Sequence, residues 1–243
     1  MDLQFVGSGD AFGTGGRLQA CLHLPTPDGG VLLDCGATSL VGLKRAGIDP
    51  ATIGWVLLSH LHGDHFGGLP FLILDGQFSR RERPLVVAGP AGTRERLAEA
   101  MEVMFPGSTQ VPRRFETTVM ELPPRVDKKV GPLSVRAYPV EHPSGAPAYA
   151  LRIAHAGMII AYSGDTAWTD SLVQAAHDAD LFICEAYVFD REVPYHLSHQ
   201  RLLAERHRLT CRRIVLIHMS PDMLAHQADS PFERARDGQT ITV

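Results

Sequence analysis

Four side chains of the kinds that bind metal ions stand within six consecutive positions. The segment WVLLSHLHGDHFGGLP contains His60, His62, Asp64 and His65, directly after an apolar run. The glycine before the aspartate lets the chain turn sharply, so that the side chains point in different directions. Imidazole nitrogens and a carboxylate, without a thiolate, suit zinc at an open catalytic site, with manganese or iron as alternatives. The pattern predicts that His60 and His62 bind one ion and that Asp64 and His65 bind a second.

Three further residues of the same chemistry follow short apolar runs later in the chain. They are His142 after YPVE, Asp165 in IIAYSGDT and His218 after IVLI. Each of them alone has a structural alternative, because strand-end histidines are often plain structural residues and an aspartate before a helix often caps it. Their meaning therefore depends on whether they join the first cluster.

The first cluster carries a resemblance to a known family. Its H-x-H-x-D-H spacing resembles the signature loop of the metallo-β-lactamase superfamily, and the string SHLHGDHFGGLP is most similar to the ribonuclease Z-like branch. In this resemblance His142 matches the third histidine, Asp165 the carboxylate that bridges two ions, and His218 the last ligand. The resemblance implies two divalent metal ions, with Zn²⁺ as the first choice, and seven ligands: His60, His62, Asp64, His65, His142, Asp165 and His218.

The resemblance also implies the fold, an α/β four-layer αβ/βα sandwich with two mixed sheets and helices outside, as a single domain over residues 1–243. The sequence pattern agrees, because short β-branched runs alternate with longer amphipathic ones. Strands are predicted at residues 3–7, 20–24, 31–35, 53–59, 85–88, 115–122, 133–140, 149–154, 158–163, 181–185 and 214–218, with a closing strand within 237–243. Helices are predicted at residues 40–46, 66–78, 92–104, 171–178 and 198–208, and residues 123–132 are predicted to form a loop.

A glutamate and a histidine outside the ligand set are predicted to handle protons. Glu185, in LFICEA, resembles the family glutamate that orients a histidine, and His196, in HLS, resembles that histidine. The surrounding residues depart from the usual wording, since Cys184 stands where a histidine is frequent and Leu197 replaces a small residue. The alternative is that Glu185 closes a strand and His196 begins a helix.

The N-terminal segment GSGDAFGTGG, residues 7–16, is glycine-rich like a phosphate-binding loop. It lacks the Gly-Lys-Ser/Thr ending, and isolated Gly-x-Gly patterns are weak evidence for phosphate binding. By resemblance to the family, we expect this segment to line the substrate site.

Two adjacent divalent ions would lower the pKa of a water shared between them and neutralise charge on an ester in the transition state. Asp64 could orient the resulting hydroxide, and His196, held by Glu185, could donate a proton to the leaving group. Phosphodiester hydrolysis is favoured, because the Glu/His pair is typical of the ribonuclease Z-like branch. Members that process tRNA carry a basic arm between the third histidine and the bridging aspartate, whereas residues 143–164 here leave no room for one. The predicted substrate is therefore a small phosphodiester such as a cyclic phosphate or nucleotide.

Four alternatives stay open on the same sequence. A lactone, thioester or β-lactam could be hydrolysed by the same ions, although glyoxalase II-type thioesterases need an extra helical domain that a short tail after His218 does not supply. Ribonuclease Z-type RNA processing is the second alternative and an iron-dependent redox reaction is the third. A non-catalytic binding protein with this fold is the fourth, and the complete ligand set argues against it.

Composition limits the partners and the cellular setting. A net charge of −4 argues against nucleic acid as a partner, although Arg80, Arg81 and Arg83 cluster, as do Arg206, Arg208, Arg212 and Arg213. Such clusters are most often solvated surface. The sequence has no apolar stretch of membrane-spanning length and no signal-peptide pattern, and its four cysteines form no CxxC pair. These features favour a soluble, cytoplasmic protein that acts on a small molecule, with no membrane partner and with homodimerisation left open.

Overall fold

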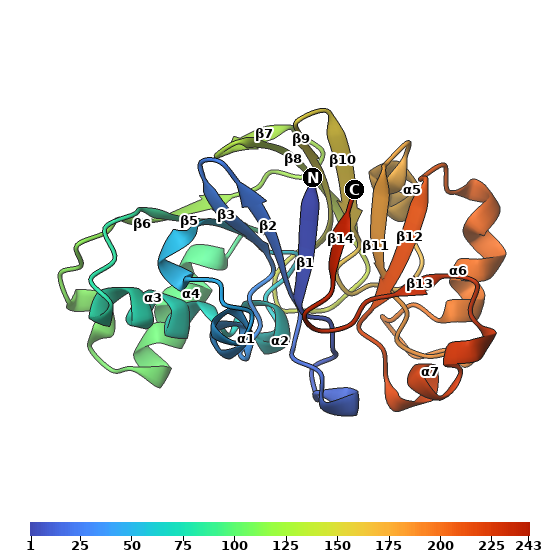
Figure 1. The fold of residues 1–243 in the computed structure, drawn as a ribbon, viewed down its shortest axis with the longest axis horizontal. Helices are drawn as coiled ribbons and strands as arrows, with labels where there is room; N and C mark the ends of the chain where they lie inside the picture. Colours follow the sequence, from blue (N-terminus) through green and yellow to red (C-terminus); the bar gives the residue numbers. More distant parts are fainter.

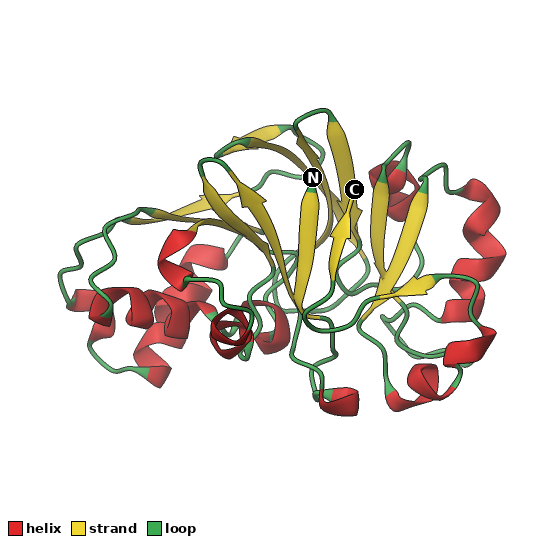
Figure 2. Ribbon diagram, viewed as in Figure 1, coloured by secondary structure: helices red, strands yellow, loops and turns green.

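Two seven-stranded mixed β-sheets face each other, and helices cover their outer sides (Figures 1 and 2). This computed structural model describes residues 1–243 with the exception of the Gln227 side chain. The first sheet has the strand order β14 (Thr240–Thr242), β1 (Asp2–Gly7), β2 (Cys21–Thr26), β3 (Gly29–Leu33), β4 (Ile53–Leu57), β5 (Leu85–Gly89) and β6 (Thr117–Glu121). The second has the order β13 (Glu233–Arg234), β12 (Arg213–Ile217), β11 (Leu181–Glu185), β10 (Met158–Tyr162), β9 (Ala148–His155), β8 (Leu133–Val140) and β7 (Lys128–Val130).

Each sheet combines an antiparallel part with a parallel part. Strands β14 to β3 pair in antiparallel fashion and β3 to β6 in parallel, while β7 to β10 are antiparallel and β10 to β13 parallel. Parallel strands need crossover connections, and these connections carry the helices that pack on the outer faces. The functional loops lie at the carboxyl ends of the strands, the usual position of ligand sites in such sheets.

The helices lie on the two outer faces (Figure 2). Those associated with the first sheet are α1 (Ser39–Arg45), α2 (Gly63–Phe66), α3 (Leu69–Phe78) and α4 (Thr93–Met104), and those associated with the second are α5 (Asp170–Ala176), α6 (His199–Glu205) and α7 (Pro221–Ala225). Short 3₁₀ turns are η1 (Thr14–Gly16), η2 (Pro50–Thr52), η3 (Ser108–Gln110), η4 (Arg206–Arg208) and η5 (Gln227–Asp229). Among the described residues, no helix is long and apolar enough to cross a membrane.

Three apolar clusters account for the four layers. The central cluster lies between the sheets and includes Phe5 of β1 and Tyr162 of β10, both completely buried. A second cluster joins the outer face of the first sheet to α1, α3 and α4, and a third joins the second sheet to α5 and α6. Burial of each large apolar side chain contributes about 1.5–3 kcal/mol, so these clusters hold the strand ends in place. The predicted four-layer α/β sandwich is confirmed.

The strand prediction was wrong in one loop and the helix prediction in two places. Residues 123–132, expected as a loop, contain β7, which pairs with β8. Within residues 66–78, expected as one helix, α2 ends at Phe66 and α3 begins at Leu69, because the backbone N–H of Gly68 donates to the carbonyl oxygen of Cys35 instead of to the preceding helical turn. Neither α7 nor the two-residue strand β13 was predicted. The closing strand expected within 237–243 is present as β14, paired with β1.

Candidate metal centre

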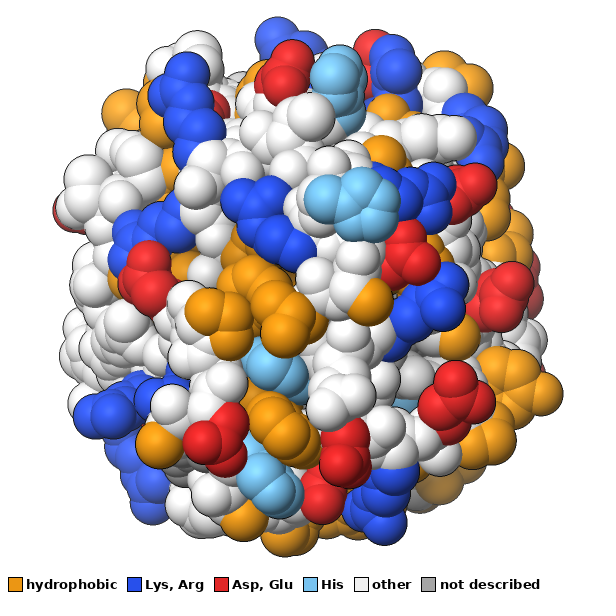
Figure 3. Space-filling view, turned by 90° about the vertical axis from the view of Figure 1, so that its right-hand side faces the viewer, with side chains coloured by type: hydrophobic (Ala, Val, Ile, Leu, Met, Phe, Trp, Pro, Cys, Tyr) orange, Lys and Arg blue, Asp and Glu red, His pale blue; other side chains and the backbone are white. Residues whose placement is uncertain are grey.

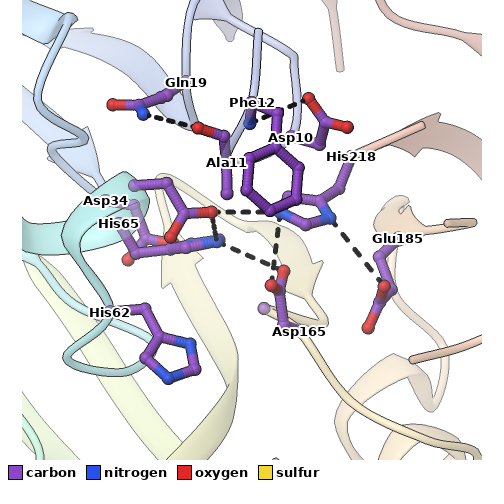
Figure 4. Close-up of polar contacts among 12 residues, drawn as sticks. Asp10, Ala11, Phe12, Gln19, Asp34, His62, His65, Asp165, Glu185 and His218 are labelled. Carbon is purple, nitrogen blue, oxygen red and sulfur yellow. Dashed lines mark hydrogen bonds and ion pairs between the residues drawn. The ribbon is translucent and has the colours of Figure 1, made fainter. Parts of the chain in front are cut away.

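The seven predicted ligands meet at one edge of the two sheets, where four strands end. Figure 4 shows four of them, His62, His65, Asp165 and His218. Asp165 follows β10 and His218 follows β12, while the H-x-H-x-D-H segment follows β4 and runs into α2. The backbone of His218 has a positive φ of 57°, a conformation that costs a non-glycine residue free energy. Gly164, directly before Asp165, has the same φ of 57°. These turns at the strand ends aim both side chains at the centre.

The ligand atoms fall into two adjacent groups. One group contains His60, His62 and His142, and within it the donor atoms lie within 4.8 Å of one another. The other group, whose donor atoms also lie within 4.8 Å of one another, contains Asp64, His65, Asp165 and His218. The carboxylate of Asp165 lies between the groups, with Oδ1 3.2 Å from His65 Nε2 and Oδ2 4.0 Å from His142 Nε2. The geometry therefore matches two neighbouring ions that share Asp165.

Hydrogen bonds at Nδ1 orient the imidazoles of His60, His65 and His142 so that Nε2 faces the centre. Nδ1 of His142 donates to the carbonyl oxygen of Tyr195 at 3.0 Å, and a carbonyl can only accept, which places the proton on Nδ1. Nδ1 of His60 lies 3.0 Å from Ser59 Oγ. Among the described residues, Nε2 of His60 is completely buried without a hydrogen-bond partner. A buried lone pair without a donor is costly unless a cation binds it, so this atom fits a metal ligand.

Asp34, which the sequence analysis did not single out, supports the centre from behind. Its completely buried carboxylate accepts hydrogen bonds from the backbone N–H and Oγ of Ser59, at 2.7 and 2.8 Å. It also accepts from Nδ1 of His65 and from the hydroxyl of Tyr162, each at 2.6 Å. Because Ser59 Oγ donates to Asp34, it accepts from Nδ1 of His60. One carboxylate thus fixes the rings of two candidate ligands.

The electrostatics of the centre favour positive charge. Burial disfavours the charged form of both the carboxylates and the imidazoles. Each carboxylate and its neighbouring imidazoles nevertheless shift one another's pKa in the direction that favours the charged forms. Burial lowers the pKa of His218, and the neighbouring Asp165 together with the hydrogen bond to Asp64 outweighs this and raises it to about 9. Burial raises the pKa of Asp64, and His65 and His218 outweigh this and lower it well below its usual value. Ionised carboxylates at this position would bind divalent cations.

Glu185 and His196 form the predicted pair beside the two groups. Nδ1 of the half-buried His196 lies 3.0 Å from Oε2 of Glu185, which is completely buried at the end of β11. The other oxygen of Glu185 accepts a hydrogen bond from the backbone N–H of Thr166. Burial lowers the pKa of His196, and the hydrogen bond and charge of Glu185 outweigh this and raise it. The arrangement leaves Nε2 of His196 available to a substrate.

A cavity of about 200 Å³ opens onto these residues. Its lining combines candidate ligands with the half-buried Tyr187 and with Ala11 and Phe12 from the glycine-rich N-terminal segment. Two residues of the segment expected to line the substrate site therefore line this cavity, although neither Phe12 nor Tyr187 was predicted individually. Figure 4 shows Phe12 over His218 and Asp165.

Comparison with known protein families places the chain in one of them. The family described as "Anti-Pycsar protein Apyc1" matches residues 1–241. The chain belongs to this family. Ribonuclease Z from Methanosarcina acetivorans is 25% identical to this Apyc1-family protein over 270 residues, which cover 90% of this chain and 87% of that enzyme.

Solved structures share the fold of this chain. Human tRNase Z, short form, superposes with a TM-score of 0.82 at 24% identity, covering 100% of this chain and 99% of that one. Zn²⁺-bound PqqB from Methylobacterium extorquens gives a TM-score of 0.77 at 16% identity and covers 100% of both chains. The Apyc1-family protein is a metal-dependent hydrolase of the metallo-β-lactamase superfamily, as the resemblance implied, and its His/Asp cluster fits a metal site.

The argument from net charge against a nucleic-acid partner conflicts with these relatives. Several of them are named ribonuclease Z or tRNase Z. Net charge is a weak guide here because it averages over the whole surface, whereas binding depends on local patches.

The two arginine clusters have different environments. Arg208, Arg212 and Arg213 form ion pairs with Asp170, Asp180 and Glu233, at 2.6, 2.9 and 2.6 Å. Figure 3 shows basic and acidic side chains mixed over this face of the Apyc1-family protein. The expectation of a solvated surface was wrong for Arg81, which is buried.

Arg81 is buried because carbonyl oxygens surround its guanidinium group. It donates hydrogen bonds to Pro50, Ile53, Arg83 and Pro84. Its role in the Apyc1-family protein is therefore to satisfy the backbone that leads into β4 and β5.

His199, the unassigned histidine nearest to His196 in the sequence, lies outside the metal centre. Its ring stacks on Phe189 with centroids 5.0 Å apart, and its Nε2 is 3.0 Å from Ser230 Oγ. In the Apyc1-family protein this histidine packs the segment that precedes α6.

Proposed function

We propose that this hydrolase is a dinuclear phosphodiesterase that acts on a small phosphodiester or cyclic phosphate. The observation that carries the proposal is that the two groups of ligand atoms and the Glu185–His196 pair lie together at one cavity. A metal centre alone would serve many hydrolytic reactions. A positioned proton donor beside it suits an ester whose leaving oxygen must be protonated.

The ligand residues divide between the two ions in this proposal. His60, His62 and His142 would hold one ion, and the carboxylate of Asp165 lies between this group and the other. Asp64, His65 and His218, together with Asp165, would hold the second ion. The nitrogen and oxygen donors favour zinc, with manganese or iron as alternatives. When bound, two such ions supply Lewis-acid charge and lower the pKa of water between them.

The protein's own residues orient the reaction. Oδ2 of Asp64 lies 3.2 Å from both His65 Nε2 and His218 Nε2, and the other oxygen of this carboxylate can accept a hydrogen bond from the attacking water. Nε2 of His196 donates a proton to the leaving oxygen. Glu185 keeps the ring of His196 in one orientation and stabilises its charged form.

A small substrate is favoured by two features of the structure. The cavity of about 200 Å³ is below the range of about 300–1,000 Å³ for pockets that enclose a drug-sized ligand. Residues 143–164 contain β9 and β10, which pair in antiparallel fashion, with Met158 opposite His155, and are joined by a short turn. This hairpin occupies the position in the sequence where tRNA-processing members carry the basic arm. The named ribonuclease relatives make RNA processing the second candidate.

The test compares substrates on one metal-loaded preparation. Bis-p-nitrophenyl phosphate, a cyclic nucleotide, a precursor tRNA and a lactone are assayed side by side, with the metal content measured on the same sample. We expect hydrolysis of the two small phosphodiesters and about two zinc ions per chain. Asp165→Asn is the matched inactive control, because it removes the shared charge at nearly constant volume. Efficient trimming of the tRNA, or faster hydrolysis of the lactone, would overturn the proposal.

A further inference from the structure

Phe12 is exposed although it lines the cavity of the metal centre. Its side chain is 82% exposed, and yet it belongs to the same cavity lining as Asp64, His142 and His218. An aromatic ring in water gains no burial energy within the chain, so packing does not explain its position. The position is set instead by the backbone that carries it.

The backbone around Phe12 is tied down on both sides. The completely buried carboxylate of Asp10 accepts hydrogen bonds from the backbone N–H of Phe12 at 3.2 Å and of Thr14 at 2.9 Å, and from Thr14 Oγ1 at 2.6 Å. The carbonyl oxygen of Ala11 accepts from the side chain of Gln19 at 2.9 Å (Figure 4). The ring is thus presented at the opening by a fixed loop.

The size of the cavity places part of any substrate at this opening. About 200 Å³ accommodates a phosphate group and the atoms next to it, but pockets that enclose a larger ligand measure about 300–1,000 Å³. A substituent that extends from the phosphate therefore leaves the cavity past its rim. Phe12 offers a flat apolar surface there, and stacking on an aromatic side chain is the general way in which proteins hold planar bases without reading their edges.

We propose that Phe12 is a specificity-determining residue that stacks on a planar ring carried by one ester substituent of the phosphodiester. The inference rests on the proposed function and deepens it, because it selects ring-bearing phosphodiesters such as nucleotides or aryl esters over alkyl esters. The face of the ring binds, so substrates with different bases are held with similar affinity.

A neighbouring cavity offers the substituent another location. It measures about 500 Å³ and is lined by Trp168, Tyr195 and Arg201, with His196 on its border with the metal centre. Arg201 is paired with Glu205 at 2.8 Å, so its charge is already compensated. Tyr195 is 52% exposed and provides a matched aromatic position for comparison with Phe12.

The experiment uses two substrate pairs that differ only in the planar ring. A nucleoside 3′,5′-cyclic phosphate is compared with its base-free ribose analogue, and bis-p-nitrophenyl phosphate with methyl p-nitrophenyl phosphate, which keeps the same leaving group. We expect Phe12→Ala to raise KM about ten-fold for the ring-bearing member of each pair, equivalent to about 1.4 kcal/mol, with kcat nearly unchanged. KM should stay constant for the base-free ribose analogue and for methyl p-nitrophenyl phosphate, whose one ring is the leaving group and not the substituent placed at Phe12. Phe12→Tyr should restore the KM of the native protein.

Two further variants make the outcome decisive. Phe78→Ala removes an equally exposed ring, 79% exposed at the end of α3, and should leave KM unchanged for all four substrates. Equal effects of Phe12→Ala on both members of each pair would overturn the inference. A rise in KM with Tyr195→Ala and none with Phe12→Ala would overturn it as well and place the ring in the larger cavity.

A binding measurement separates this inference from the proposed function. Calorimetry of a nucleoside 5′-monophosphate on the metal-loaded protein should give a Kd about ten-fold weaker for Phe12→Ala. If the native protein hydrolyses no phosphodiester and this difference persists, the proposed function fails and the role of Phe12 in binding stands. If the difference is absent, the role of Phe12 fails even when hydrolysis is observed.

Discussion

Oδ2 of Asp34 lies 2.6 Å from Nδ1 of His65, and both side chains are completely buried. The carboxylate comes from the turn after β3 and the imidazole from α2, so their contact joins two consecutive crossovers of the first sheet. Asp34 adopts a positive φ of 58°, a strained conformation that the surrounding hydrogen bonds maintain. The residue therefore connects the backbone at two strand ends to the orientation of a candidate ligand.

Asp34→Asn should weaken metal binding. Both carboxylate oxygens accept hydrogen bonds, and an amide would place its NH₂ group against N–H or O–H donors from Ser59, His65 or Tyr162. We expect about 10–100-fold lower metal affinity, measured by competition with a chromogenic chelator. Asp28→Asn, at an exposed position in the β2–β3 turn, is the matched control. Unchanged affinity in Asp34→Asn would show that the hydrogen bond to His65 does not position a ligand.

His196→Ala should reduce kcat about 10²–10⁴-fold while the protein keeps its full metal content. The reason is that His196 lies beside the two ligand groups and contributes a proton rather than a metal bond in the proposed reaction. Glu185→Gln should lower kcat by a smaller factor, because the imidazole remains and only its support is lost. Metal analysis and steady-state kinetics on the same samples provide the measurement.

The double variant tests whether these two residues act together. If Glu185 acts through His196, then His196→Ala combined with Glu185→Gln should be no slower than His196→Ala alone. If the loss of kcat in the double variant equals the sum of the two single losses on the free-energy scale, then Glu185 and His196 act independently. A loss of metal in His196→Ala would instead make this histidine a ligand, which its closeness to His142 and Asp165 allows.

The sequence predicted the strand ends and the candidate ligands for a physical reason. Apolar runs such as IVLI before His218 must be buried, and a polar residue that follows one lies at the rim of the core. The order of the predicted ligands then matched one family pattern. The fold followed from the same resemblance, and the two sheets confirm it.

What the sequence did not reveal depends on contacts between distant residues. Asp34 has no motif of its own, and its partner Tyr162 is 128 positions away. Arg81 stands in a charged run, but it is buried because four carbonyl groups converge on its guanidinium. Strand β7 has two exposed lysines in three residues and exists through its pairing with β8. Phe12 gave no signal because an exposed ring is informative only once the cavity beside it is known.

Removal of metal should destabilise the fold. Asp64 and Asp165 bring two carboxylates into a buried centre, and a bound cation offsets their repulsion. At a free-metal concentration of 100 times Kd, binding at one site adds about 2.7 kcal/mol, which corresponds to about 5–10 °C in Tm for a chain of this size. Thermal unfolding is measured after chelation and again with added zinc. Asp165→Asn should show a much smaller shift, and an equal shift in that variant would place the metal elsewhere.

Gly164→Ala should disturb the centre through the backbone. Gly164 has a φ of 57°, and an added Cβ would stand 2.7 Å from Ser59 Cβ and 3.1 Å from the carbonyl oxygen of Tyr149. The unfavourable φ and the overlap should together lower the free energy of unfolding by about 2–4 kcal/mol. Relief of the overlap requires movement of the neighbouring Asp165 away from the position between the two ligand groups, so metal content should fall as well.

Gly54→Ala is the control for this prediction. Gly54 is a buried glycine in β4, and an added Cβ would meet no described atom within 4 Å outside its chain neighbours. Its effect on the free energy of unfolding should stay within about 0.5 kcal/mol, with full metal content, both followed by urea denaturation and metal analysis. If Gly164→Ala is destabilised but keeps both ions, Asp165 tolerates displacement. In that case the bridging position of its carboxylate does not control metal binding.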